Sequence, residues 1–191
     1  MSSTNSAFGL RPVKHPSGQV RPYQLAGGIA TAYNTAIYQN QAVKLASTGV
    51  IEVASGGDAF VGSFQGCQYT DSGSNKRIIT NKWPASAAYV AGSMVATFTR
   101  DPEIIYEIQA DGAVAQTAIG ACSDLTNTTS GNATTGLSAA TMQATMTAAG
   151  SSAQVEVLDL ALLPDNAWSD AYTVVQVRIN EHQERASVVG V

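Results

Sequence analysis

Two segments of the chain alternate apolar and polar side chains with a period of two residues. In residues 103–110, Ile104, Tyr106 and Ile108 share one face, and glutamate and glutamine side chains occupy the other. Residues 173–180 repeat this pattern, with valine and isoleucine on one face. Because successive side chains of a β-strand point to opposite faces, both segments are predicted to be half-buried strands.

Weaker segments of the same kind are separated by glycine-containing turns. They cover residues 43–45, 50–53, 59–64, 77–80 and 94–99. Several short strands at this spacing indicate an antiparallel β-barrel or sandwich. We therefore expect a mainly β protein with at most one or two short helices.

One further segment breaks the alternation. In residues 154–163, the apolar positions begin at Val155 and Val157 and then move to Leu158, Leu160 and Leu162. A strand with this sequence would place part of one apolar face in water, unless an extra residue were inserted or both faces were covered. The pattern predicts a β-bulge or a fully buried strand.

The first 35 residues differ in character from the rest. Pro12, Pro16 and Pro22 each restrict the preceding residue to extended conformations, so no helix can run through this segment. Apolar side chains are spaced along it, which indicates that it lies on its own domain or on a neighbouring subunit. We expect residues 1–35 to form an extended N-terminal arm and residues 36–191 a single β-rich domain.

A long uncharged segment falls inside that domain. Residues 125–155 contain no charged side chain and consist largely of threonine, alanine, serine, glycine and asparagine. Leu137, Met142 and Met146 lie near helical spacing behind Ser138, a candidate N-cap. We expect a short helix between loops here, although the threonine content disfavours a long one.

The cysteines and histidines limit the chemistry. Cys67 and Cys122 are far apart and lack a CxxC pattern, so we expect no zinc site and two buried free thiols; the alternative is a single disulfide between them. His15 has no acidic neighbour in the sequence to orient it, which makes it a poor catalytic base. No nucleophile-elbow, phosphate-loop, dinucleotide, zinc-protease or calcium-loop motif is present. We expect no enzyme, metal or cofactor; the weakest alternative is a hydrolase built from His182 and distant carboxylates.

Charge is sparse and unevenly placed. Charged residues make up 13% of the chain; residues 1–50 carry a net charge of +4 and the remainder −8. Four scattered cations are too few for a nucleic-acid interface, so we expect no nucleic-acid partner. No apolar run approaches the ~18 residues of a membrane span, and we expect neither membrane insertion nor export. A basic extended segment is suited to an acidic protein surface.

Several short motifs resemble those of a family of virion proteins. They are Ala7-Phe8-Gly9-Leu10-Arg11-Pro12-Val13 followed by His15 and Gly18, Phe64-Gln65-Gly66-Cys67-Gln68-Tyr69, Trp83-Pro84, Asp101-Pro102, Leu163-Pro164-Asp165-Asn166 and Val175-Gln176-Val177-Arg178-Ile179-Asn180-Glu181-His182. In these motifs, scattered over most of its length, the chain is similar to the capsid decoration or cement proteins of tailed bacteriophages. The resemblance implies a homotrimer, made in the host cytoplasm, on the outer surface of the virion. There it would bind the major capsid protein and clamp neighbouring capsomers after capsid expansion.

Under this hypothesis the arm is the first candidate for docking, by strand addition to a capsid-protein sheet or by reaching a neighbouring trimer. Phe8 and Tyr23 would be anchors, and Arg11 and Lys14 would pair with shell carboxylates. The whole candidate set is Phe8, Arg11, Pro12, Val13, Lys14, His15 and Tyr23. The alternative is that the arm packs on its own domain.

A second functional hypothesis is a carbohydrate-binding module on the virion surface that aids host adsorption. The uncharged threonine-rich loops and Trp168 would then form the ligand face. Trp168 and Trp83 both lie next to turn residues, and the competing interpretation of each is an anchoring side chain in the core or in an interface.

Overall fold

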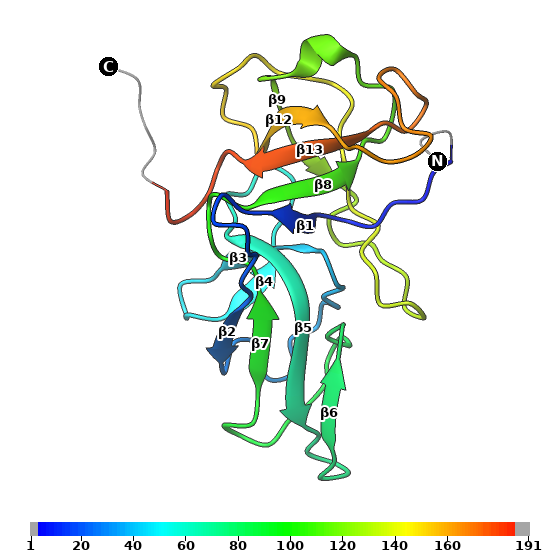
Figure 1. Cartoon of the computed structure of the whole chain (residues 1–191). Coiled ribbons are helices and arrows are strands. Elements are labelled where there is room, and N and C mark those ends of the chain that lie inside the picture. Colours follow the sequence, from blue (N-terminus) through cyan, green and yellow to red (C-terminus); the bar gives the residue numbers. More distant parts are fainter. Residues whose placement is uncertain (1–3, 186–191) are drawn as a thin grey trace.

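The computed structural model describes residues 4–185 and contains two large antiparallel sheets (Figure 1). The first sheet has the strand order β1-β8-β13-β12-β9. Its strands are β1 (Arg11–Lys14), β8 (Ile105–Gln109), β13 (Val174–Ile179), β12 (Val155–Leu160) and β9 (Cys122–Ser123). It lies above the second sheet in the view of Figure 1.

The second sheet has six strands. Its order is β2-β7-β5-β3-β4, and a further strand, β6, pairs with β5. These strands are β2 (Tyr23–Ala26), β7 (Val95–Phe98), β5 (Gly62–Thr70), β3 (Ala42–Leu45), β4 (Ile51–Val53) and β6 (Arg77–Thr80). Both sheets are open in the described part of the chain. The predicted mainly β, antiparallel architecture is therefore confirmed, in a form closer to a sandwich than to a closed barrel.

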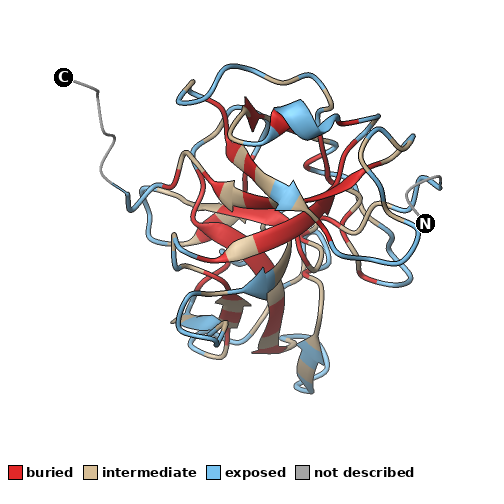
Figure 2. Ribbon diagram, turned by 45° about the horizontal axis from the view of Figure 1, so that its top comes forward, coloured by how far each residue is buried: buried red, intermediate tan, exposed pale blue. Residues whose placement is uncertain are grey.

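Each large sheet has its own hydrophobic cluster. The first cluster includes Tyr106, Ile108, Val175 and Val177, and the second includes Phe64, Trp83 and Phe98. Figure 2 shows buried residues along the central strands and exposed ones along the loops. The two parts are joined through polar contacts such as that of Thr99, whose Oγ1 lies 2.9 Å from the buried Tyr106 hydroxyl.

The strands predicted from periodicity are present. Residues 103–110 contain β8 and residues 173–180 contain β13, and the two strands pair with each other. β13 is half-buried as predicted, but both faces of β8 are covered, because Glu107 and Gln109 are buried as well. In β12 the register shifts between Val157 and Asp159, which confirms the predicted bulge. The bulge keeps Val155 and Val157 buried, while the exposed Leu162 lies beyond the strand.

The prediction of a short helix within residues 125–155 is wrong. This segment instead forms β10 (Leu125–Thr126) and β11 (Thr141–Met142), which pair antiparallel. Leu125 and Met142 are buried and directly opposite each other, and β-branched threonines suit this extended backbone better than a helix. The helical structure assigned within residues 4–185 is one 3-10 turn, η1 (Gln116–Ala118).

The N-terminal arm is extended, as predicted, and it lies on the protein's own β-rich body. β1 pairs with β8 in the first sheet, and β2 pairs with β7 in the second. Both are edge strands of their sheets. Among the residues described, no helix has the length and apolar character needed to cross a membrane.

Candidate functional site

The arm enters the fold at a tight contact with the segment that precedes β3. The amide of Leu10 donates a 2.7 Å hydrogen bond to the carbonyl oxygen of Asn40, and the Asn40 side chain donates to the carbonyl of Phe8. Leu10 is fully buried in the first hydrophobic cluster. These bonds fix the backbone immediately before β1, so the candidate docking residues start from an anchored position.

Arg11 and Glu107 form the main polar contact between β1 and β8. They are cross-strand partners, and Arg11 Nη2 lies 2.5 Å from Glu107 Oε2. The guanidinium also stacks over the ring of Phe8, with 4.7 Å between its central carbon and the ring centroid. Arg11 therefore contacts this protein's own body, and Phe8 does so through its carbonyl while its ring packs on Arg11 within the arm. This is the arrangement in which the arm packs on its own domain.

The next residues of β1 face outward. Pro12 lies opposite Tyr106, and the register shifts between Pro12 and Lys14. Val13 is 38% exposed, and the Lys14 side chain is also exposed. No ion pair involves Lys14 among residues 4–185. An exposed apolar side chain and an available cation thus stand next to each other on an edge strand.

His15 has an acidic partner that the sequence did not reveal. Its Nε2 atom lies 3.2 Å from Oδ2 of Asp101, which belongs to the connection between β7 and β8. The two residues are far apart along the chain, so local sequence inspection could not pair them. The fold therefore supplies the orienting acid that the sequence neighbourhood of His15 lacks.

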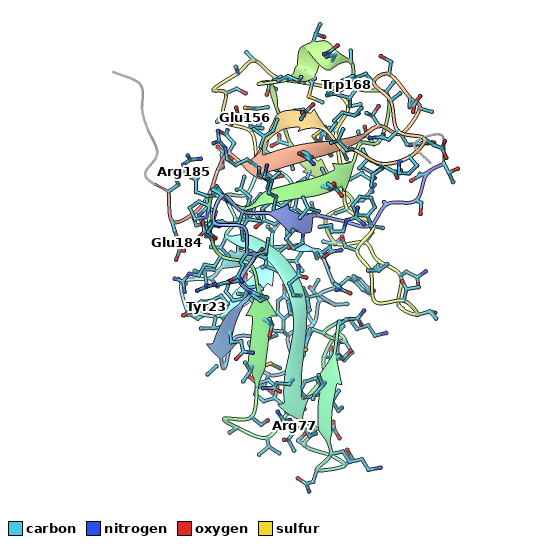
Figure 3. All side chains as sticks on the ribbon, viewed as in Figure 1. Tyr23, Arg77, Glu156, Trp168, Glu184 and Arg185 are labelled. Carbon is cyan, nitrogen blue, oxygen red and sulfur yellow. The ribbon has the colours of Figure 1, made fainter. Side chains whose placement is uncertain are left out.

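Tyr23 lies at the start of the other edge strand. Its ring packs edge-on against Phe98, and the Arg100 guanidinium stacks over it at 4.6 Å from the ring centroid. Arg100 is held in turn by Glu184, whose oxygens lie 2.8 and 2.9 Å from Arg100 Nε. This pairing keeps the pKa of Glu184 below its ordinary value. Figure 3 labels Tyr23 and Glu184, which lie on the same side of the molecule.

His182 is part of the interior. It is 4% exposed, and its Nε2 lies 2.9 Å from the carbonyl oxygen of Val61, while Nδ1 accepts from the amide of Glu184. Burial lowers the pKa of the imidazole. Both ring nitrogens are thus bonded to backbone, which gives His182 a structural role, although the carboxylates of Glu184 and Asp101 lie near enough to oppose the effect of burial on its pKa.

The cysteines and Trp83 are interior residues too. Cys67 and Cys122 are free, buried thiols, as predicted, and burial raises the pKa of Cys67 to about 12. The Trp83 ring is fully buried, and its Nε1 donates to the carbonyl of Tyr33. Within residues 4–185 no group of three or more histidine, cysteine, aspartate or glutamate side chains could hold a metal ion.

The threonine-rich segment lines a separate depression of about 490 Å³. Asn127, Ser130, Asn132 and Thr141 contribute to it, together with Asn5 from the N-terminal arm and four further residues, Ser6, Ala7, Asp111 and Ala139. Trp168 is not part of this lining; it is half-buried and packs against the first hydrophobic cluster. The sequence predicted one ligand face formed by the threonine-rich loops and Trp168, but the structure places Trp168 outside the depression that these loops line.

The candidate residues of the arm therefore fall into two groups. Phe8, Arg11, Pro12, His15 and Tyr23 are engaged with the body through backbone or side chain, whereas Val13 and Lys14 project from the edge. No family model, curated protein or solved structure matches the chain.

Proposed function

We propose that this protein is a structural virion component that binds the exterior of an expanded phage capsid and stabilises it by clamping neighbouring capsomers. The observation that supports it best is the placement of β1 and β2. One leading segment supplies an edge strand to each of the two large sheets. An edge strand presents backbone groups that a further strand from a partner can bind. Two edges from one segment suit a protein that bridges two neighbours.

The side chains of β1 match this role. Val13 offers an apolar contact, and Lys14 offers a positive charge to carboxylates on the shell protein. Arg21, between β1 and β2, is a second exposed cation on the same segment. Charge complementarity of this kind directs a partner to one register and speeds encounter more than it adds affinity. The internal contacts of Arg11 and Tyr23 would hold the two edges in place for docking.

Stabilisation of a shell follows from binding alone. A protein that binds the expanded lattice and not its precursor shifts the equilibrium toward the expanded state, through many identical contacts. Such a role requires no reactive group. Self-association as a homotrimer would multiply these contacts, and a closed symmetric interface would limit the assembly to a fixed size.

The decisive experiment mixes the purified protein with expanded, undecorated heads and with unexpanded heads. We expect co-sedimentation with the expanded form, saturation at a fixed stoichiometry and a higher melting temperature of the particle. Light scattering of the free protein measures the oligomer number, for which we expect three. Failure to sediment with any head form would remove the proposal.

Variants of the edge test the docking element. Val13→Asp and Lys14→Glu change exposed side chains of β1. Each should weaken head binding by tenfold or more, which corresponds to the loss of one contact of about 1.4 kcal/mol between β1 and the shell protein. Lys76→Glu, in the exposed turn between β5 and β6, reverses a charge at the far end of the second sheet and serves as the control. If the control weakens binding as much as Lys14→Glu, the effect is one of net charge and β1 is not the docking edge.

A second candidate function, carbohydrate binding at the virion surface, is favoured by the depression around Asn127 and Asn132. Amide and hydroxyl side chains are suited to sugar hydroxyls, although no aromatic ring lines this depression. A glycan array distinguishes the two functions. Specific hits that Asn132→Ala abolishes would favour the carbohydrate hypothesis, and an array without hits would eliminate it.

A further inference from the structure

We propose that Ser17, His15 and Asp101 form a serine nucleophile site for small carboxylic esters. Ser17 Oγ lies 2.6 Å from His15 Nδ1, and His15 Nε2 lies 3.2 Å from Asp101 Oδ2. A hydroxyl, an imidazole and a carboxylate bonded in this order form the constellation that activates serine in unrelated hydrolases. Such sites are recognised by geometry and by roles, whatever the order of their residues in the chain. The inference does not depend on the capsid-binding proposal.

The hydrogen bonds of the turn determine which imidazole nitrogen carries the proton. The backbone amide of Ser17 donates to His15 Nδ1 at 3.1 Å, so Nδ1 is the acceptor. In the neutral ring the proton is then on Nε2, where Asp101 accepts it. The single lone pair of Nδ1 therefore lies between two donors, the Ser17 amide at 3.1 Å and the Ser17 hydroxyl at 2.6 Å, and the shorter contact is the one that a general base would use. The tautomer therefore suits proton transfer from Ser17 to His15.

Asp101 is itself held in position. Its Oδ1 accepts a 2.9 Å hydrogen bond from the backbone amide of Glu103, which leaves Oδ2 for His15. The opposite side of the site is fixed by the turn in which the amide of Gly18 donates to the carbonyl of His15 at 2.8 Å. Asp101 acts through His15 and is a positioning residue, whereas Ser17 and His15 are the catalytic residues.

The three residues open on a depression of about 290 Å³. Its other lining residues are Gln19, Arg21 and Ile104. This volume is at the small end of the range of ligand pockets, which favours short acyl groups. Ile104, which is 1% exposed, contributes a small apolar patch to the floor of the depression. The guanidinium of Arg21 can stabilise the negative charge that develops on the carbonyl oxygen.

The reaction balances with water as the only co-reactant. Ser17 Oγ forms a bond to the ester carbonyl carbon while His15 Nδ1 takes the hydroxyl proton. The carbon–oxygen bond to the alcohol then breaks, and the alcohol leaves with that proton. Water, deprotonated by His15, attacks the acyl-serine, releases the carboxylic acid and returns the proton to Ser17. No electrons are exchanged with an external oxidant or reductant.

A covalent probe tests the nucleophile directly. The full chain is treated with a fluorophosphonate, and the modified residue is identified by mass spectrometry. We expect labelling at Ser17 that Ser17→Ala abolishes and His15→Gln slows about a hundredfold, the scale of general-base assistance. Ser47→Ala removes an exposed hydroxyl from the turn after β3 and should change nothing. Labelling of Ser17 no faster than that of Ser47 would overturn the proposal.

Ester turnover tests the role of Asp101. With p-nitrophenyl acetate and p-nitrophenyl octanoate as probes, we expect the acetate to be the better substrate and Asp101→Asn to lower kcat at least tenfold with KM little changed. Asp101→Glu, which keeps a carboxylate, should restore part of the rate. Circular dichroism checks that each variant is folded. Equal rates for Asp101→Asn and the unmodified protein, or turnover that survives Ser17→Ala, would overturn the proposal.

Discussion

The backbone of Gly9 packs so closely against the carbonyl oxygen of Asn40 that a Cβ atom on residue 9 would overlap it. Gly9 also has a φ of 75°, in the left-handed region that residues with a side chain rarely adopt. The contact lies one residue before Leu10, which the first hydrophobic cluster buries. The attachment of the leading segment thus depends on the absence of a side chain at one position.

Gly9→Ala should therefore lower the free energy of unfolding by about 3 kcal/mol, through combined backbone strain and overlap. Gly18 is the matched control, because it has a similar φ of 82° and open space around its α-carbon. Gly18→Ala should cost only about 1 kcal/mol. Urea unfolding of both variants measures the difference, and equal losses would mean that the contact with Asn40 contributes nothing.

Removing the charge of Glu107 should weaken the attachment of β1. Its carboxylate is 10% exposed, while Arg11 is 43% exposed, so solvent screens part of the attraction. We expect a coupling of about 1 kcal/mol in a double-mutant cycle of Glu107→Gln and Arg11→Met, measured by urea unfolding. The same cycle on Arg185 and Glu103, an exposed pair at 3.5 Å, should give about zero. A larger coupling in the exposed pair would contradict this ranking.

Stability should fall as the pH is lowered through the ordinary pKa of histidine. His182 has a lowered pKa because burial disfavours its charged form, despite the nearby Glu184 and Asp101. The unfolded chain therefore binds a proton at a higher pH than the native protein does. The stabilisation that comes from keeping His182 neutral is fully present above its ordinary pKa of 6.5. It is lost as the pH falls toward the lower pKa that His182 has in the native protein.

Urea unfolding between pH 8 and pH 5 measures this dependence. In His182→Gln the fall of the unfolding free energy over this range should be smaller, because the titrating group is gone while an amide can still donate to Val61. The comparison is between slopes, since the substitution also changes the absolute stability. An unchanged slope would show that other groups cause the dependence.

Cys67 should resist thiol reagents in the native protein. It is 4% exposed, and its pKa is raised to about 12, so the reactive thiolate is scarce at neutral pH. In a Cys122→Ser background, labelling with a disulfide reagent should wait for unfolding and accelerate with urea in parallel with the loss of native structure. Rapid labelling without denaturant would place Cys67 at the surface.

The positions of the regular strands could be predicted from the sequence better than the pairing of one strand with another. Alternation located β13 because a half-buried strand displays it directly. It also located β8, although Arg11 and the start of the arm cover the polar side chains Glu107 and Gln109. The strands β1 and β2 gave no such signal: prolines dominate the segment, and its pairing depends on strands found much later in the chain. The helical spacing of Leu137, Met142 and Met146 was misleading because three apolar residues among small ones fit several periods.

The candidate site could be predicted only in part. An extended arm follows from the proline spacing, and the backbone contact of Phe8 with Asn40 and the ring contact of Tyr23 with Phe98 agree with anchoring on the protein itself. The pairing of His15 with Asp101 could not be predicted, because these residues meet through the register of β1 on β8 and the loop that precedes β8. The local sequence around a residue does not show which distant residue it contacts in the fold.

The two edge strands also set an order of events during synthesis. Arg11 and Glu107 are separated by 96 positions, so β1 emerges from the ribosome long before β8 exists to receive it. Contacts between such distant residues form slowly, because a long loop must close first. β2 gains its partner when β7 is made and β1 only when β8 follows. A nascent chain that stops before β7 therefore leaves the arm without either partner and exposes the edges of an unfinished body to any neighbouring strand.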